Sequence, residues 1–196
     1  MTRSIYALRD SILKEGRLVL PLAQLAGISG VPRGSVKVYA DRLVKKGFAQ
    51  RIIEGTIALT SDPFVIATQL VEPSYVSLTS AFYLHGLIKQ VPSLIECITT
   101  RNTRRFEDLE VRYHRVHPSL FFGYERVEKG GSYVFVAKPE KALLDMIYFG
   151  SLYSQLSDEV LEHLDRRQLR SYAERFGTTR GFRAKRIMNW VKGHAR

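Results

Sequence analysis

Side chains that can recognise nucleic acid recur at helical spacing in one segment of this 196-residue chain. Arg33, Ser35 and Lys37 carry hydrogen-bond donors of the kind that contact base edges in the major groove of DNA. Arg42 and Lys45 follow on the same segment, where cationic side chains suit phosphate groups. This spacing predicts a helix that selects bases with its beginning and holds the sugar–phosphate backbone with its end.

A helical projection of residues 33–46 separates an apolar arc from a polar one. Each residue of a helix is rotated by about 100° from the one before it, which places the apolar side chains together on one arc. That arc is expected to be buried. It contains Val36, Tyr39, Ala40, Leu43 and Val44. The opposite arc contains Gly34, Ser35, Val38, Asp41, Arg42 and Lys45, with Lys37 at its edge. The polar arc is therefore the predicted DNA-binding face.

Three residues near this face have particular consequences. Gly34 would let the backbone approach DNA closely, and Arg51 could reach a minor groove or a phosphate. Asp41 opposes phosphate unless it pairs with Arg42 or Lys45 or accepts from a cytosine. The predicted DNA-contact set is Arg33, Gly34, Ser35, Lys37, Val38, Arg42, Lys45 and Arg51. The alternative interpretation is a solvated helix face in a domain that binds protein.

The elements around this segment fit a winged helix-turn-helix domain over residues 1–62. Apolar residues recur at helical spacing in residues 4–15, and Pro21 suits the first turn of a second helix. Gly47 ends the third helix, and two short strands then turn at Glu54–Gly55. Three helices followed by a hairpin are the order that this fold requires.

Residues 63–196 predict a second domain of the α+β class, with an antiparallel sheet and a helical tail. Alternating apolar residues predict strands, including a hairpin that turns at residues 128–131. Pro139 suits the first turn of a helix, and basic amphipathic helices complete the chain. The junction falls at Ser61–Pro63. The whole chain is therefore expected to be α+β, with a winged helix-turn-helix followed by a mixed α+β domain.

The net charge favours a polyanionic partner. The chain has 30 Lys and Arg against 19 Asp and Glu, a formal net charge of +11. Residues 1–60 carry ten basic and four acidic side chains, residues 61–150 ten of each, and residues 151–196 ten and five. Lys and Arg that neutralise phosphates dominate affinity for nucleic acid. The alternative is a cationic surface that serves solubility alone.

The end of the chain is the most basic segment. Residues 175–196 include seven basic side chains and no acidic one. Ile187, Trp190 and Val191 are expected to dock the last helix. That packing would leave Arg183, Lys185, Arg186 and Lys192 in water. These exposed side chains either have no binding role, or they make a second contact with phosphate groups or with RNA.

Support for catalysis is weak. A nuclease-like carboxylate–lysine set could be assembled from Glu107, Asp108, Glu110, Glu140 and Lys141. However, Glu140 already suits a helix N-terminus, where acidic side chains are favoured. His114 and His117, three apart on one expected strand, would face opposite sides and could not share a metal ion. His85 is expected to be a core residue. We therefore expect no enzyme, no metal site and no cofactor.

Cysteine usage and hydropathy indicate a compartment. The single cysteine, Cys97, excludes an internal disulfide and is expected to be buried. Charged residues near the N-terminus exclude a signal peptide, and no stretch is long and apolar enough to span a membrane. The sequence therefore predicts a soluble, cytoplasmic protein.

Sequence blocks distributed over nearly the whole chain carry a family resemblance. After the basic winged module come SYVSLTSAFYLHGL, ECITT, FFGYERV, VAKPEKALLDMIYFG and LDRRQLRSYAERFG. Their order resembles the AbiEi-type antitoxins, the transcriptional-regulator half of type IV abortive-infection toxin–antitoxin pairs. The most specific parts are residues 77–87 and 139–145.

The resemblance implies a DNA-binding autorepressor of its own operon that acts in phage defence. Its operator would contain inverted repeats, and its C-terminal domain would counter a nucleotidyltransferase-like toxin without forming a stable complex. Arg101, Arg104 and Arg105 are the candidate antitoxin surface, although an exposed basic loop is an equal interpretation. One alternative is a general transcription regulator whose second domain senses a ligand or dimerises. Another is a nucleic-acid-processing enzyme that its winged domain targets.

Overall fold

The computed structural model describes residues 4–30, 32–151, 158–179 and 181–194, which form two compact units. The N-terminal unit comprises residues up to 72 together with residues 127–134. The C-terminal unit comprises residues 73–126 and those from 135 onward. Both units mix helices with strands, so the chain has the predicted α+β composition.

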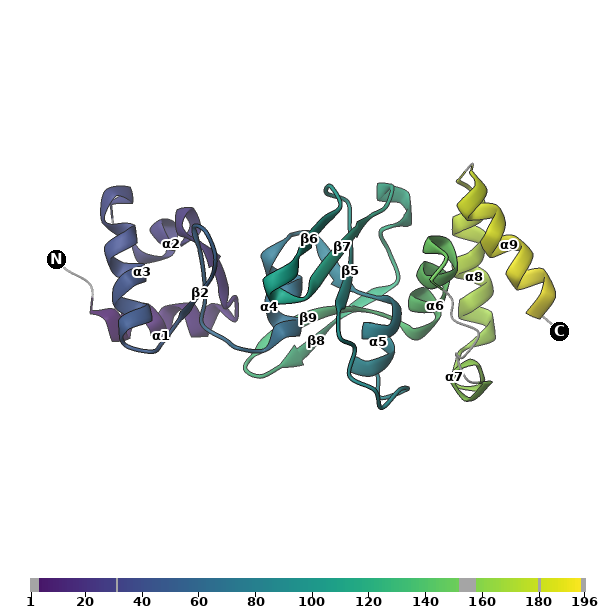
Figure 1. Ribbon diagram of the computed structural model, residues 1–196, viewed down its shortest axis with the longest axis horizontal. Helices are drawn as coiled ribbons and strands as arrows, with labels where there is room; N and C mark the ends of the chain where they lie inside the picture. Colours follow the sequence, from purple (N-terminus) through teal and green to yellow (C-terminus); the bar gives the residue numbers. More distant parts are fainter. Residues whose placement is uncertain (1–3, 31, 152–157, 180, 195–196) are drawn as a thin grey trace. The chain divides into compact units, whose positions relative to one another are not determined.

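Residues 5–58 of the N-terminal unit form the helices α1, α2 and α3 and a small antiparallel sheet (Figure 1). The elements of this range are α1 (Ile5–Glu15), β1 (Val19–Pro21), α2 (Leu22–Ser29), a 3₁₀ turn (Arg33–Ser35), α3 (Val36–Lys45), β2 (Gln50–Ile53) and β3 (Thr56–Ala58). The sheet order is β1–β3–β2, so the hairpin pairs back onto the strand that precedes α2. The helix expected at residues 33–46 begins with a 3₁₀ turn and becomes α-helical at Val36.

The end of α3 is fixed by backbone hydrogen bonds around Gly47. The N–H of Gly47 donates to the carbonyl of Val44, and the N–H of Phe48 donates to that of Leu43. Gly47 has φ of +70°, a left-handed conformation that glycine adopts without strain. Two lysines and one glycine therefore stop the helix where the sequence predicts, and the chain turns directly into β2.

Helix α4 (Pro63–Leu70) continues the N-terminal unit past the junction predicted near residue 62. Asp62 caps it by accepting from the N–H groups of Phe64 and Val65. The buried Gln69 side chain accepts from the backbone of Leu18 at 2.8 Å. Its amide nitrogen donates to Ser132 Oγ at 2.9 Å. Because backbone N–H groups beside β1 need acceptors, this glutamine ties α4 and residues 127–134 to the N-terminal unit.

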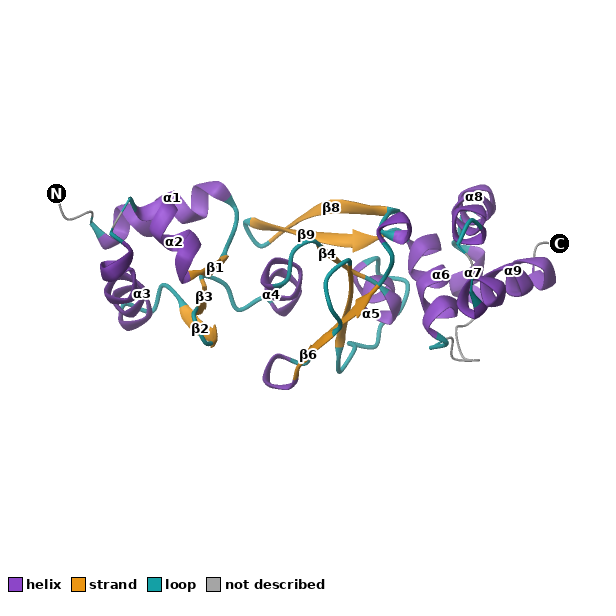
Figure 2. Cartoon of the chain, turned by 90° about the horizontal axis from the view of Figure 1, so that it is seen from above, coloured by secondary structure: helices purple, strands orange, loops and turns teal. Residues whose placement is uncertain are grey.

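The C-terminal unit is built around a six-stranded sheet with the order β6–β7–β5–β4–β9–β8, of which residues 127–134 in β8 and β9 are grouped with the N-terminal unit. Its strands are β4 (Ser74–Val76), β5 (Ile95–Thr99), β6 (Arg104–Phe106), β7 (Val111–Arg115), β8 (Tyr124–Lys129) and β9 (Ser132–Ala137). Its helices are α5 (Leu78–Leu84), α6 (Pro139–Phe149), α7 (Asp158–Glu162), α8 (Arg166–Gly177) and α9 (Phe182–His194). The last helices, α6, α8 and α9, pack side by side (Figure 2).

The prediction of an antiparallel sheet is wrong, because the sheet is mixed. Strands β5 and β7 are parallel, as are β4 and β9, whereas β4 and β5 are antiparallel. The hairpin of β6 and β7 places its second strand, not its first, beside β5. Alternation of apolar residues reports which face of a strand is buried but not which neighbour it pairs with, so strand direction is decided by tertiary pairing.

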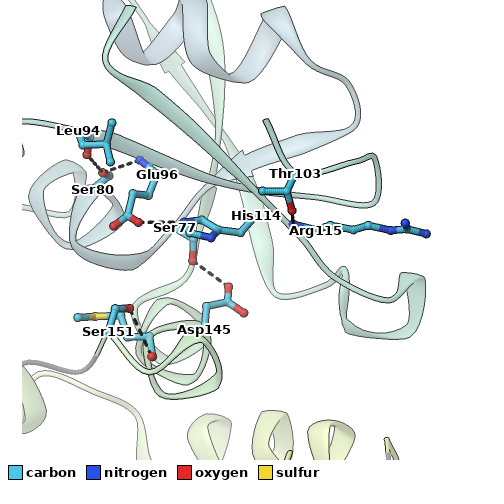
Figure 3. A network of polar contacts seen from close by, with 10 residues as sticks. Ser77, Ser80, Leu94, Glu96, Thr103, His114, Arg115, Asp145 and Ser151 are labelled. Carbon is cyan, nitrogen blue, oxygen red and sulfur yellow. Dashed lines mark hydrogen bonds and ion pairs between the residues drawn. The ribbon is translucent and has the colours of Figure 1, made fainter. Parts of the chain in front are cut away.

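An ion pair between Lys141 and Asp145 lies in the core of the C-terminal unit. Both residues are on α6, one helical turn apart, and neither side chain has any exposed surface. Asp145 also accepts from Ser77 Oγ at 2.8 Å (Figure 3) and from the Tyr75 hydroxyl at 3.2 Å. These contacts satisfy the carboxylate oxygens, which is the condition for tolerating a buried charge.

Aromatic rings surround the buried ammonium group. The Lys141 Nζ atom lies 4.7 Å from the ring centre of Phe176, 5.1 Å from that of Phe122 and 5.5 Å from that of Tyr75. Burial lowers the pKa of Lys141, and the adjacent Asp145 opposes that shift. Burial, followed by the Asp145 charge, raises the pKa of Tyr75, so its hydroxyl keeps the proton that it donates. The pair therefore joins α6, α8 and β4.

Replacing Lys141 should show how much the free energy of unfolding falls when one partner of this buried pair is removed. Lys141→Met leaves the Asp145 carboxylate without its cation, and we expect a loss of about 3–5 kcal/mol in the free energy of unfolding. Adding Asp145→Asn removes the unpaired charge and keeps an oxygen that accepts from Ser77, so the double variant should recover much of the loss. Urea unfolding followed by circular dichroism measures all three proteins. Equal stability of the single variant and the wild type would contradict the assignment.

Candidate nucleic-acid interface

Helix α3 buries the apolar arc that the sequence predicts. Val36 and Tyr39 are 4% and 7% exposed, and Ala40 and Leu43 are 0% exposed. They pack into one cluster with residues of α1, α2 and β3, including Leu8, Ile12, Leu25 and Ile57. Val44 is half-buried at the edge of the cluster. Since the helix is held by this side, its opposite side faces outward.

The outward face of α3 carries the predicted contact residues. Lys37, Val38, Arg42 and Lys45 are all exposed, as is Gly34 in the preceding turn, and Ser35 is half-buried. The backbone of Arg33 lies in the 3₁₀ turn, but its side chain is outside the described part of the structure. We call the exposed set Gly34, Lys37, Val38, Arg42 and Lys45 the α3 outer face. Its charged members are Lys37, Arg42 and Lys45, and Val38 among them is apolar.

Asp41 and Arg51 form an ion pair beside the α3 outer face. The sequence offers Arg42, Lys45 or a cytosine as partners that would make Asp41 tolerable near phosphate, and the partner in the structure is Arg51. Arg42 instead stacks over the ring of Tyr39, with 5.5 Å between its guanidinium carbon and the ring centre. Arg51 reaches Asp41 because β2 packs beside α3. The pairing neutralises the carboxylate and also occupies the arginine predicted to reach DNA.

The three arginines of the predicted antitoxin surface do not form one face. Arg101 follows β5, whereas Arg104 and Arg105 are consecutive on the edge strand β6, and their side chains therefore point to opposite sides. Arg105 Nε lies 2.9 Å from Glu107 Oε1. Arg105 also lies opposite Arg112 of β7 in the strand register. Charges on this short edge strand have an ordinary structural role, because they discourage pairing with another chain.

The residues considered for a nuclease-like set are dispersed. Glu140 Oε1 accepts from the backbone N–H of Asp165 at 2.9 Å, and Lys141 is committed to Asp145. Glu107, Asp108 and Glu110 lie on the exposed turn between β6 and β7, where Glu107 pairs with Arg105. The set therefore has no common site in this fold.

His85, His114, His117 and Cys97 each have a local environment that accounts for their presence in the fold. His114 Nε2 donates to Glu96 Oε1 at 2.9 Å (Figure 3), whereas His117 lies beyond β7 and caps a 3₁₀ turn. His85 Nε2 donates to the carbonyl of Ala137. Cys97 is buried, and burial raises the pKa of its thiol. Within residues 4–30, 32–151, 158–179 and 181–194, no three His, Cys, Asp or Glu side chains are grouped as metal ligands.

The basic tail forms the expected helix with an exposed cationic side. Ile187 of α9 is fully buried, and Trp190 and Val191 are half-buried. The exposed side carries Arg183, Lys185, Arg186 and Lys192, as predicted. Several arginines stack on rings: the guanidinium carbon of Arg175 lies 3.6 Å from the ring centre of Phe122.

Sequence reasoning missed a cavity of about 680 Å³ in the C-terminal unit. His117, Ser119, Tyr148, Thr178, Phe182 and Arg183 are among its lining residues. Phe182 is 73% exposed, and Arg183 stacks over Tyr148 with 5.5 Å between its guanidinium carbon and the ring centre. These residues come from three separate segments, so no local motif could have indicated the cavity.

Comparison with known proteins found no family model that matches this chain, and no curated protein sequence matched it. No helix in the described part of the chain is long and apolar enough to cross a membrane.

The packing of α3 predicts very different costs for two positions that are two residues apart. Leu43→Ala removes a fully buried side chain and should lower the free energy of unfolding by about 2–5 kcal/mol. Asp41→Ala should change it by less than about 1 kcal/mol, because both partners of the Asp41–Arg51 pair are substantially exposed. Urea unfolding of the two variants measures the difference. A cost at Asp41 equal to that at Leu43 would show that the surface pair, not the buried arc, holds the helix.

Proposed function

We propose that the N-terminal unit is a winged helix-turn-helix and that the chain is a DNA-binding transcriptional autorepressor. The observation that carries the proposal is the α3 outer face: a cationic helix side held outward by burial of the opposite arc. An α-helix with its side chains is about 10–12 Å wide, and the major groove of B-DNA is about 12 Å wide. The face therefore has the dimensions and the charge for a groove.

The arrangement of the neighbouring elements supports this role. Helix α2 and the 3₁₀ turn precede α3, and the hairpin of β2 and β3 follows it at the position of a wing. In this class of domain the recognition helix contacts bases with its N-terminal residues, which here are Arg33 to Val38. Arg42 and Lys45 lie nearer the C-terminal end, where contacts with phosphate are favoured.

We further propose that this regulator is a cytoplasmic antitoxin of a type IV abortive-infection pair, on the basis of its resemblance to the AbiEi-type proteins. The two blocks that carry the resemblance contact each other, because Ser77 donates to Asp145. The proposed partner is a nucleotidyltransferase-like toxin that is countered without a stable complex. The proposed operator contains inverted repeats in the chain's own promoter. This role requires no catalytic step, metal ion or cofactor.

Binding to the DNA upstream of the chain's own gene tests the regulator. Arg33→Ala should weaken binding by about 1–3 kcal/mol and relax specificity at one base pair. Arg42→Ala combined with Lys45→Ala should weaken binding to every sequence alike and reduce the slope of log affinity against log salt by about two. Mobility shifts at several salt concentrations measure both effects.

Lys14→Ala provides a matched control, because this exposed lysine lies on α1 in the same unit. It should leave both the specificity and the salt slope unchanged. If the wild type gives no shift with its own upstream DNA, the regulator proposal fails. An unchanged slope in the Arg42 and Lys45 double variant would remove α3 as the binding element.

A specific observation also favours the second candidate, a regulator whose C-terminal unit senses a ligand. The cavity beside Phe182 has a volume within the usual range for small-molecule sites, about 300–1,000 Å³. Co-expression with a nucleotidyltransferase-like protein encoded next to the chain's own gene separates the candidates. Rescue of growth supports the antitoxin, and rescue that survives Arg183→Ala shows that the cavity is not needed for it. Absence of rescue, with DNA release by a small molecule that depends on Arg183, supports the sensor.

A further inference from the structure

An exposed apolar side chain occupies the centre of the α3 outer face. Val38 is 49% exposed, in the first turn of α3. One turn before it lies Gly34, where an added Cβ would meet no atom within 4 Å. One turn after it lie Arg42 and the paired Asp41. The isopropyl group therefore projects beside a bare stretch of backbone, with cationic side chains around it.

Helical propensity does not account for valine at this position. A β-branched side chain loses rotamer freedom in a helix, and a lysine or glutamate would suit a solvated face better. Isolated apolar residues are common on protein surfaces, so exposure alone indicates nothing. Val38 differs because it lies between groups that suit bases, at Ser35 and Lys37, and groups that suit phosphate, at Arg42 and Lys45.

We propose that Val38 contacts the 5-methyl group of a thymine in the major groove and so selects thymine at one position of each bound site. This inference rests on the proposed DNA binding. Valine has no donor or acceptor, so it cannot read the nitrogen and oxygen atoms of the base edges. The thymine methyl is the apolar feature that the major groove presents, and cytosine lacks it. The bare backbone at Gly34 permits the close approach that such a contact needs.

The experiment begins with selection of binding sites from a randomised DNA duplex by the full-length chain. Each thymine of the selected site is then replaced in turn by deoxyuridine, which removes only the methyl group. For the wild type, one position per half-site should lose about fourfold in affinity, the value expected for one buried methyl group. Val38→Ala should bind the thymine and deoxyuridine duplexes equally, with an unchanged salt slope.

Two further variants complete the test. Val38→Thr keeps one methyl group on the same branched shape and should retain part of the thymine preference. Leu13→Ala removes another exposed apolar side chain, 43% exposed on α1, and should leave the preference intact. Thermal unfolding should be little changed in all three variants, because none of these side chains is in the core.

The outcomes distinguish this inference from the proposed function. If no duplex is enriched, DNA binding itself fails. If a duplex is enriched but no deoxyuridine substitution lowers its affinity, DNA binding stands and the role of Val38 is overturned. A penalty that persists unchanged in Val38→Ala likewise overturns it, because another side chain must then contact the methyl group.

Discussion

The burial of one arc of α3 is the constraint on which the N-terminal unit depends. Val36, Tyr39, Ala40 and Leu43 can leave water only if the helix lies against the cluster formed with α1, α2 and β3. Because α3 is rotated about its own axis so as to bury this arc, Lys37, Val38, Arg42 and Lys45 all face outward. The hydrophobic effect thus positions these exposed groups, of which Arg42 also stacks over the ring of Tyr39.

The C-terminal unit relies on a different kind of interaction. Lys141 and Asp145 form a fully buried pair in which the carboxylate also accepts from Ser77 and Tyr75. Such a pair contributes little net stability relative to apolar residues, but breaking it is costly, because one charge would remain unpaired in a medium of low dielectric constant. It therefore restricts how α6, α8 and β4 can be arranged.

Charges elsewhere in the chain fall into paired and outward-facing sets. Asp41 and Arg51, Arg105 and Glu107, and Arg17 and Glu72 form ion pairs at or near the surface. On α9, by contrast, Arg183, Lys185, Arg186 and Lys192 are exposed on a helix without acidic residues. Exposed cations also lie on the strands β6 and β7, for example Arg104 and Arg112, so the net charge of +11 is spread over helices and strands.

The sequence by itself determined the helices α1, α2 and α3, the buried arc of α3 and the exposed residues of α9, because a period of 3.6 residues and local stop signals such as Gly47 encode them within one segment. The direction of the strands and the pairing of Asp41 with Arg51 were decided only by the tertiary structure. The same holds for the burial of Lys141 among the rings of Tyr75, Phe122 and Phe176, because a lysine is expected at the surface. Each of these depends on contacts between different elements of the fold, and apolar periodicity carries no information about which elements meet.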